Sequence, residues 1–85
     1  PTVIQIAHDI WTVDGRVDIE DLSEAVGTPL PEGPFSTVGG LIMALFGKVP
    51  KEGDVVEDGG FRYTVLTMDR QRVDRIKIEK DTGER

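Results

Sequence analysis

The chain lacks cysteine altogether, and this absence removes several classes of function at once. With no cysteine in 85 residues, disulfide frameworks, thiolate metal sites and cysteine nucleophiles are excluded. The composition is compatible with a reducing compartment. Histidine is nearly absent as well, and His8 has neither a second histidine nor a cysteine with which to form a zinc site. We therefore interpret His8 as an ordinary strand-edge or surface residue rather than a general base or a pH-sensing group.

Long apolar runs are also missing. The longest, Leu41 to Phe46, is far shorter than the roughly 20 residues that a membrane-spanning helix needs. A signal-peptide pattern is absent, and the chain begins with Pro1 instead of methionine. We interpret the chain as a fragment of a longer protein, and we expect no direct membrane insertion by this fragment.

Basic residues are scarce in the first half of the chain. The net charge of −6 arises entirely before Lys48, where Arg16 is the only base, and acids and bases balance from Lys48 onward. A polyanion would be repelled by the first half and would meet interleaved acids in the second. The charge pattern therefore argues against nucleic-acid binding.

Two short helices are predicted between apolar strand-like segments. Asp14-Gly15 indicates a turn after one or two strands within residues 2–13. Asp18 is expected to cap a first helix by accepting a backbone N–H, with Asp21 placed three residues later as in a capping box, and Gly27 is expected to end the helix. Ser36 or Thr37 is expected to cap a second helix, which the sequence places at residues 38–46, with Gly47 after it.

The second helix is apolar nearly all round, so we expect it to be almost wholly buried. Gly39 and Gly40 each cost about 1 kcal/mol relative to alanine inside a helix, so a close neighbour must need the missing side chains. Close helix–sheet packing is the favoured explanation. The alternative is that their N–H groups approach an anion.

The second half reads as three strands. Asp58-Gly59-Gly60 is a strong hairpin signal, because two-residue hairpin turns need positive φ. Residues 61–68 alternate clearly, and Asp69-Arg70-Gln71 turns the chain back into residues 72–80. Val73 is out of phase with the later apolar positions, which predicts a bulge near Asp74.

These patterns predict one α+β domain in the order β-α-α-β-β-β, with a largely antiparallel sheet and two short helices packed on it. The aromatic residues are scattered among apolar neighbours, which is typical of a core. Trp11 and Tyr63 are also candidates for interface anchors if they are exposed.

Acidic residues near the first helix form the most tempting site. Asp14, Asp18 and Asp21 are weak candidates for a divalent-cation site, because Mg²⁺ and Ca²⁺ need several converging carboxylates. Their spacing does not match the EF-hand pattern. Favourable placement of acids at a helix N-terminus is the preferred explanation.

Several stretches together resemble the CorC/HlyC transporter-associated domain. They are Val13-Asp14-Gly15 before Asp21-Leu22, Thr37-Val38-Gly39-Gly40-Leu41, the Gly-x-x-Pro-x-x-Gly run from Gly47 to Gly53, and the Arg-x-x-Arg pattern at Arg72 and Arg75. The match extends from Ile10 to Lys80. Relatives often place glycine or asparagine where this chain has Asp69-Arg70-Gln71.

The resemblance implies a transporter-associated domain at residues 10–80, preceded by an N-terminal strand or linker remnant at 1–9 and followed by a polar tail at 81–85. It implies a module that follows a CBS pair and a membrane domain in magnesium/cobalt efflux or hemolysin-like proteins, at the cytoplasmic face of the bacterial inner membrane. The fold is grouped with a subdomain of certain FAD-binding proteins. This sequence shows no flavin motif, and no cofactor is expected.

The leading hypothesis is a non-catalytic regulatory module that docks by a sheet face or edge against CBS domains or a second copy, so that a homo-oligomer is possible. The alternative is a ligand-binding module for a divalent cation or an adenine-containing nucleotide such as FAD. An enzyme is disfavoured, because the residues supply no acid/base pair and no nucleophile with a partner.

Overall fold

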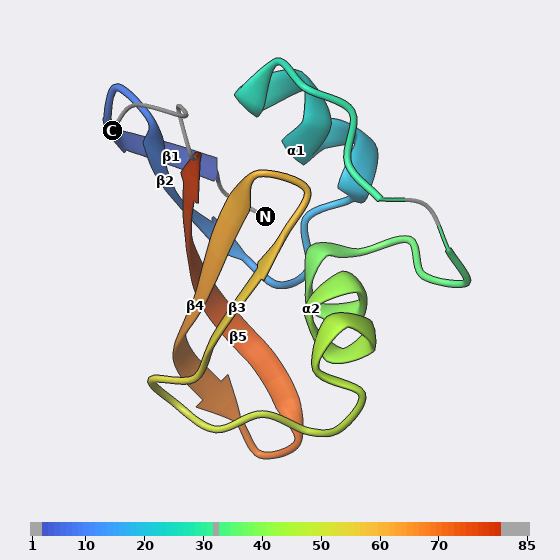
Figure 1. Ribbon diagram of the computed structural model, residues 1–85. Helices are drawn as coiled ribbons and strands as arrows, with labels where there is room; N and C mark the ends of the chain where they lie inside the picture. The colour runs from blue at the N-terminus through green and yellow to red at the C-terminus, as the bar shows by residue number, and fades with distance from the viewer. Residues whose placement is uncertain (1–2, 32, 81–85) are drawn as a thin grey trace.

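The computed structural model describes residues 3–31 and 33–80 and shows helices packed on a single sheet (Figure 1). The strands are β1 (Val3–Ala7), β2 (Ile10–Asp14), β3 (Val55–Asp58), β4 (Phe61–Asp69) and β5 (Arg72–Lys80). The helices are α1 (Ile19–Val26) and α2 (Val38–Phe46). The predicted α+β class is confirmed, and the apolar segment at the start of the chain, for which one or two strands were predicted, forms two, so the order is β-β-α-α-β-β-β. The tail at 81–85 lies outside the described residues.

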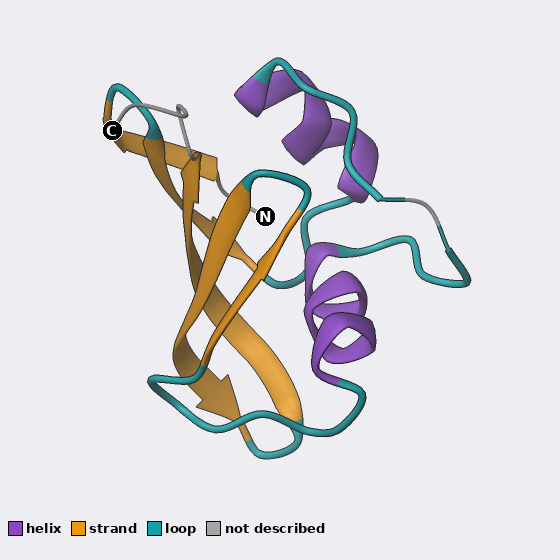
Figure 2. Cartoon of the chain, in the orientation of Figure 1, coloured by secondary structure: helices purple, strands orange, loops and turns teal. Residues whose placement is uncertain are grey.

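The described strands form one antiparallel sheet in the order β1-β2-β5-β4-β3. Strands β2 and β5 are neighbours although both helices lie between them in sequence, so the last strand closes the sheet against the first part of the chain. Both helices lie on the same side of the sheet (Figure 2). No helix of residues 3–31 and 33–80 covers the opposite face of the sheet.

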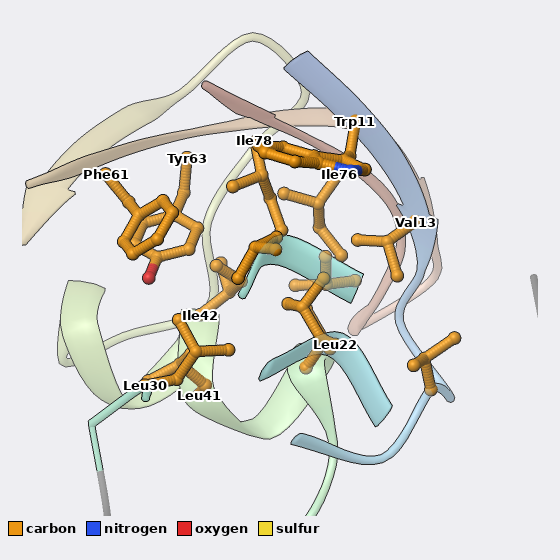
Figure 3. Packing of buried hydrophobic residues seen from close by; sticks show 14 of the residues in the cluster. Trp11, Val13, Leu22, Leu30, Leu41, Ile42, Phe61, Tyr63, Ile76 and Ile78 are labelled. Atoms are coloured by element: carbon orange, nitrogen blue, oxygen red, sulfur yellow. The ribbon is translucent and has the colours of Figure 1, made fainter. Parts of the chain in front are cut away.

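The hydrophobic core fills the space between the helices and the covered face of the sheet (Figure 3). Strand pairing brings core side chains into register, since Trp11 lies opposite Ile78 and Ile78 lies opposite Tyr63. The fully buried large side chains are Tyr63, Leu22, Leu41, Ile42, Ile76, Ile78, Val13, Val38 and Val65. Burying an aliphatic or aromatic side chain of this size contributes about 1.5–3 kcal/mol to the stability of the fold. The cluster therefore holds both helices against the sheet.

The helix ends confirm most of the predicted caps. Gly27 and Gly47 are left-handed, with φ of 74° and 72°, and the hydroxyl of Thr37 accepts a hydrogen bond from the Gly40 N–H at 3.2 Å. The predicted cap at Asp18 is wrong in its chemistry. Asp18 occupies the N-cap position, but its side chain makes no capping hydrogen bond.

Helix α2 is less buried than its composition predicts. Val38, Leu41 and Ile42 are buried, whereas Ala44 is exposed and Phe46 is half-buried. The outer side of α2 has no further layer of structure over it among the described residues (Figure 1). The expectation of nearly complete burial is therefore wrong, because composition does not say how many faces of a helix are covered.

The predicted bulge at Asp74 is present and is compensated on the neighbouring strand. Val65 pairs with Ile76, Thr67 with Arg75, and Met68 with Val73. One extra residue thus occurs on each strand, Leu66 on β4 and Asp74 on β5. The shift at Asp74 returns Val73 to the buried face despite its sequence phase.

Candidate functional site

Three segments that are distant in sequence meet through backbone contacts at the start of α2. The Gly15 N–H donates to the Asp74 carbonyl at 2.8 Å, and the Gly39 N–H donates to the Gly15 carbonyl at 2.8 Å. The Val38 N–H donates to the Val17 carbonyl, also at 2.8 Å. These bonds tie the turn after β2 to both α2 and β5. The junction therefore fixes the helix on the sheet.

The glycines of α2 serve close packing at this junction. A Cβ atom on Gly39 would lie 3.0 Å from the Gly15 carbonyl oxygen, and one on Gly40 would lie 3.0 Å from Cβ of Phe35. The N–H groups of both glycines are already used, by the Gly15 carbonyl and the Thr37 hydroxyl respectively. An anion would have to displace these internal acceptors. Of the two explanations, the geometry supports close packing.

A groove of about 300 Å³ borders the junction. Its lining includes Arg16, Gly40, Met43 and Arg72, together with the carboxylates of Asp14 and Asp74. Both carboxylates are engaged internally. Asp14 Oδ1 accepts from the Arg16 N–H at 2.9 Å, and Asp74 Oδ2 accepts from the Thr67 hydroxyl at 3.0 Å. The groove is thus lined by side chains of both charge signs, and its bonded carboxylates already accept hydrogen bonds from within the fold.

The acidic metal candidates are not brought together. Asp14 ends β2, Asp18 precedes α1, and Asp21 lies exposed in the first turn of α1. Across residues 3–31 and 33–80, the structure contains no cluster of three or more histidine or acidic side chains positioned to hold a metal ion. His8 is exposed and lies 3.2 Å from the Asp9 carboxylate.

The aromatic interface candidates are both buried. Trp11 and Tyr63 belong to the core (Figure 3). In this conformation neither side chain is exposed enough to contact a partner. The Tyr63 hydroxyl has no hydrogen-bond partner among the described residues. Burial, and secondarily the negative charge of Asp58, raises the pKa of Tyr63 to about 12.

The surface that remains available is the helix-free face of the sheet with its two edges. One cross-strand row runs over that face from Ile4 through Thr12, Lys77 and Thr64 to Val55. The two ends of the row are apolar and exposed, Ile4 at 46% and Val55 at 50%. None of these residues was predicted as a site residue. The apolar alternation at the start of the chain is the signal that points to Ile4.

The edges of the sheet differ in character. The outer edge of β3 carries Glu57, which is bonded to Arg62 at 3.1 Å, followed by Asp58. The outer edge of β1 carries no charge from Val3 to Ala7, and Ile6 is 56% exposed. Exposed apolar side chains on an unpaired strand mark a surface suited to contact with another chain.

Comparisons of the sequence with known proteins point in one direction. A family model described as the transporter associated domain CorC_HlyC matches residues 4–82. The magnesium and cobalt efflux protein CorC of Escherichia coli K12 is 32% identical over 75 residues, which cover 88% of this chain and 26% of that protein. CorC of Vibrio cholerae is also 32% identical, over 74 residues. The chain thus spans about a quarter of the length of these curated relatives.

Solved structures show the same fold. The Mg²⁺ and Co²⁺ transporter (CorC) associated region from Neisseria meningitidis MC58 matches with a TM-score of 0.84 and 25% identity, covering 94% of this chain and 99% of that one. A CorC_HlyC domain from a Xylella fastidiosa hemolysin, in complex with Mg²⁺ and Mn²⁺, matches with a TM-score of 0.80 and 24% identity, covering 94% and 98%. In the described part of the present chain, neither helix is long and apolar enough to cross a membrane.

Proposed function

Because this chain belongs to the family of CorC/HlyC transporter-associated domains, we propose that it is a non-catalytic accessory module of a larger ion-transport protein of the magnesium and cobalt efflux or hemolysin-like type. The module acts by docking against other parts of that protein, a CBS pair and a membrane domain, or against a second copy. It lies on the cytoplasmic face of the bacterial inner membrane, a location compatible with a cysteine-free chain.

One observation carries the docking mechanism, namely the helix-free sheet face with an uncharged edge strand. The core side chains all point to the covered face, so the open face can change its contacts without disturbing the packing of α1 and α2. The open face mixes apolar ends with a polar centre at Thr12, Lys77 and Thr64. Mixed surfaces of this kind suit interfaces that form and separate.

Docking regulates transport only if it favours one state of the transporter over another. A module that binds two states with equal affinity shifts nothing, whereas a differential affinity of about 1.4 kcal/mol changes the ratio of states tenfold. The open face supplies such a difference when its partner surface is exposed in one transporter state and covered in the other.

The test uses the full-length parent protein. Deleting the module is expected to change metal efflux or metal tolerance, and unchanged transport would contradict the proposal. A finer variant is Lys77→Glu, which reverses a charge at the centre of the open face. Lys48→Glu is the matched control, because it makes the same charge change in the loop after α2. The first variant should alter transport and the second should not, at equal protein abundance.

A second candidate function is favoured by one relative, the Xylella fastidiosa domain whose structure contains Mg²⁺ and Mn²⁺. Under this alternative the module binds a divalent cation, and binding shifts the transporter between its states. Isothermal calorimetry of the isolated domain with Mg²⁺, Mn²⁺ and Co²⁺, with FAD as a separate titrant, decides between the two. Saturable heat that Asp14→Asn abolishes would support cation binding, whereas flat heats for every titrant would remove the alternative.

A further inference from the structure

The outer edge of β1 is built differently from the other edge of the sheet. An edge strand exposes unpaired backbone N–H and C=O groups, and natural sheets protect such edges with charges, proline or very short strands. Strand β3 has this protection, being four residues long and ending in Glu57 and Asp58. Strand β1 has five residues and no charge or proline between Val3 and Ala7. Its one protective feature is the bulge at Ile6, where the pairing shifts between Gln5 and Ala7.

The side chains of this edge are apolar as well as uncharged. Ile4 is 46% exposed and Ile6 is 56% exposed, which makes Ile6 the most exposed of the large apolar residues recorded for the described chain. Covering them would add apolar burial to any backbone pairing at the edge. The edge therefore offers unpaired backbone groups and exposed apolar side chains, which are the two contributions on which strand addition depends.

We propose that β1 is the contact through which two copies of this domain pair, antiparallel and edge to edge, about a twofold axis near Gln5. The inference rests on the proposed docking function and names its partner as a second copy. A twofold arrangement about Gln5, on the N-terminal side of the bulge, brings Ile4 of one copy next to Ile6 of the other. The strand is thus complementary to itself, as a twofold interface requires.

Charge favours this partner over the other available edge. Antiparallel pairing about Gln5 brings no two like charges opposite each other within Val3–Ala7. Pairing β1 with β3 of another copy would instead place Glu57 and Asp58 against apolar residues, which would desolvate the Glu57–Arg62 ion pair and the Asp58 carboxylate with no new charged partner. A β1–β3 contact would also be of the head-to-tail kind, which builds rings or open filaments instead of a twofold pair.

The extent of the contact sets its strength. A five-residue strand is about 17 Å long, and such a pair covers less surface than the roughly 1,200 Å² of a stable standard interface. The pairing is therefore weak in dilute solution. Copies held together in one assembly experience an effective concentration of about 1 mM through a short flexible tether, and under that condition a weak edge contact becomes populated.

The first experiment is disulfide trapping on the isolated domain, which has no native cysteine to interfere. Gln5→Cys should form an intermolecular disulfide at about 1 mM protein, because the two residues at position 5 meet at the axis. Glu57→Cys on β3 is the matched control, exposed on the opposite edge of the sheet, and should crosslink at least about tenfold more slowly. Equal rates for the two variants would overturn the proposal.

The second experiment measures association without a crosslink. Sedimentation velocity of the wild type should show reversible dimerisation, and Ile6→Lys should weaken it at least about tenfold, which corresponds to about 1.4 kcal/mol. Val55→Lys is the control, since Val55 is 50% exposed on the other edge strand. A thermal melt checks that each variant is folded. A monomeric wild type at about 1 mM, or loss of the dimer with Val55→Lys alone, would refute the β1 contact.

A third measurement, in the full-length protein, separates this inference from the proposed function. Gln5→Cys should crosslink two copies of the intact protein. If another segment of the longer chain occupies the edge, no crosslink will form and the inference is refuted. The accessory role would still be judged independently by the effect of module deletion on transport.

Discussion

Gly15 and Gly39 face each other across the junction between the sheet and α2, with the Gly39 N–H 2.8 Å from the Gly15 carbonyl oxygen. Neither position leaves space for an ordinary side chain. A Cβ on Gly15 would lie 2.1 Å from the Val73 carbonyl oxygen, and one on Gly39 would lie 3.0 Å from the Gly15 carbonyl oxygen. Absent side chains on both residues thus allow three backbone segments to approach within hydrogen-bonding distance.

Gly15→Ala should destabilise the domain by about 2–3 kcal/mol, because backbone atoms of β5 would have to move to admit the methyl group. Gly27→Ala is the control. Gly27 has a φ of 74° and nothing within 4 Å of an added Cβ, so that change costs only the left-handed conformation, about 1 kcal/mol. Urea unfolding followed by tryptophan fluorescence measures both. A smaller loss for Gly15→Ala than for Gly27→Ala would contradict the steric role of this junction.

The second prediction concerns the two N-cap residues, Thr37 and Asp18, whose removal should lower stability by different amounts. Thr37→Ala should cost about 1 kcal/mol, since the hydroxyl accepts from the Gly40 N–H. Asp18→Ala should cost less, because that carboxylate makes no capping bond and contributes only through the helix dipole, a few tenths of a kcal/mol when exposed. Chemical denaturation of the two variants at low and high salt tests the order, and salt should diminish only the effect at Asp18.

The turn between β4 and β5 supplies a third prediction. Arg70 is the only non-glycine residue with positive φ in the described chain, at 62°. Left-handed backbone costs an ordinary residue about 1–2 kcal/mol, and asparagine tolerates it better. Arg70→Asn should therefore raise the stability by up to about 1 kcal/mol. Gln71→Asn, at the neighbouring turn position without positive φ, should give no such gain, and equal gains in thermal melts would count against strain at Arg70.

Local chemistry made much of this fold predictable. The glycines after each helix, the Thr37 cap and the hairpin at Asp58-Gly59-Gly60 depend on a few adjacent residues, and their predicted positions are confirmed. The bulge at Asp74 was predictable for the same reason, because alternation along a strand shows where its phase breaks.

Features set by distant segments were not predictable in this way. Asp14-Gly15 reads as a simple turn, yet Gly15 is required by its approach to Val73, 58 positions along the chain. The partial exposure of α2 depends on which of its faces other elements cover. The exposed edge of β1 was missed because a sequence does not show which strand ends a sheet.

A fourth prediction concerns removal of the Tyr63 hydroxyl. The hydroxyl is fully buried without a hydrogen-bond partner among residues 3–31 and 33–80, and leaving such a group unpaired costs about 1–3 kcal/mol. Tyr63→Phe keeps the ring and removes the group, so it should leave stability unchanged or raise it by about 1 kcal/mol at neutral pH. A loss greater than about 1 kcal/mol would show that the hydroxyl is stabilised by a contact, such as a bound water.

The same residue makes stability depend on alkaline pH. Burial, with a smaller contribution from Asp58, raises the folded pKa of Tyr63 to about 12 from 10.0, so the folded state keeps the phenolic proton after the unfolded chain has lost it. The unfolded state then binds fewer protons, and stability falls as pH rises between about 10 and 12, by at most about 1.4 kcal/mol per pH unit. Below pH 10 this contribution is fully present. Tyr63 is the only tyrosine, so phenolate absorbance near 295 nm reports on it alone, and stability should fall less steeply over this pH range in Tyr63→Phe than in the wild type. An ordinary titration near pH 10 in the folded protein would contradict the burial of this hydroxyl.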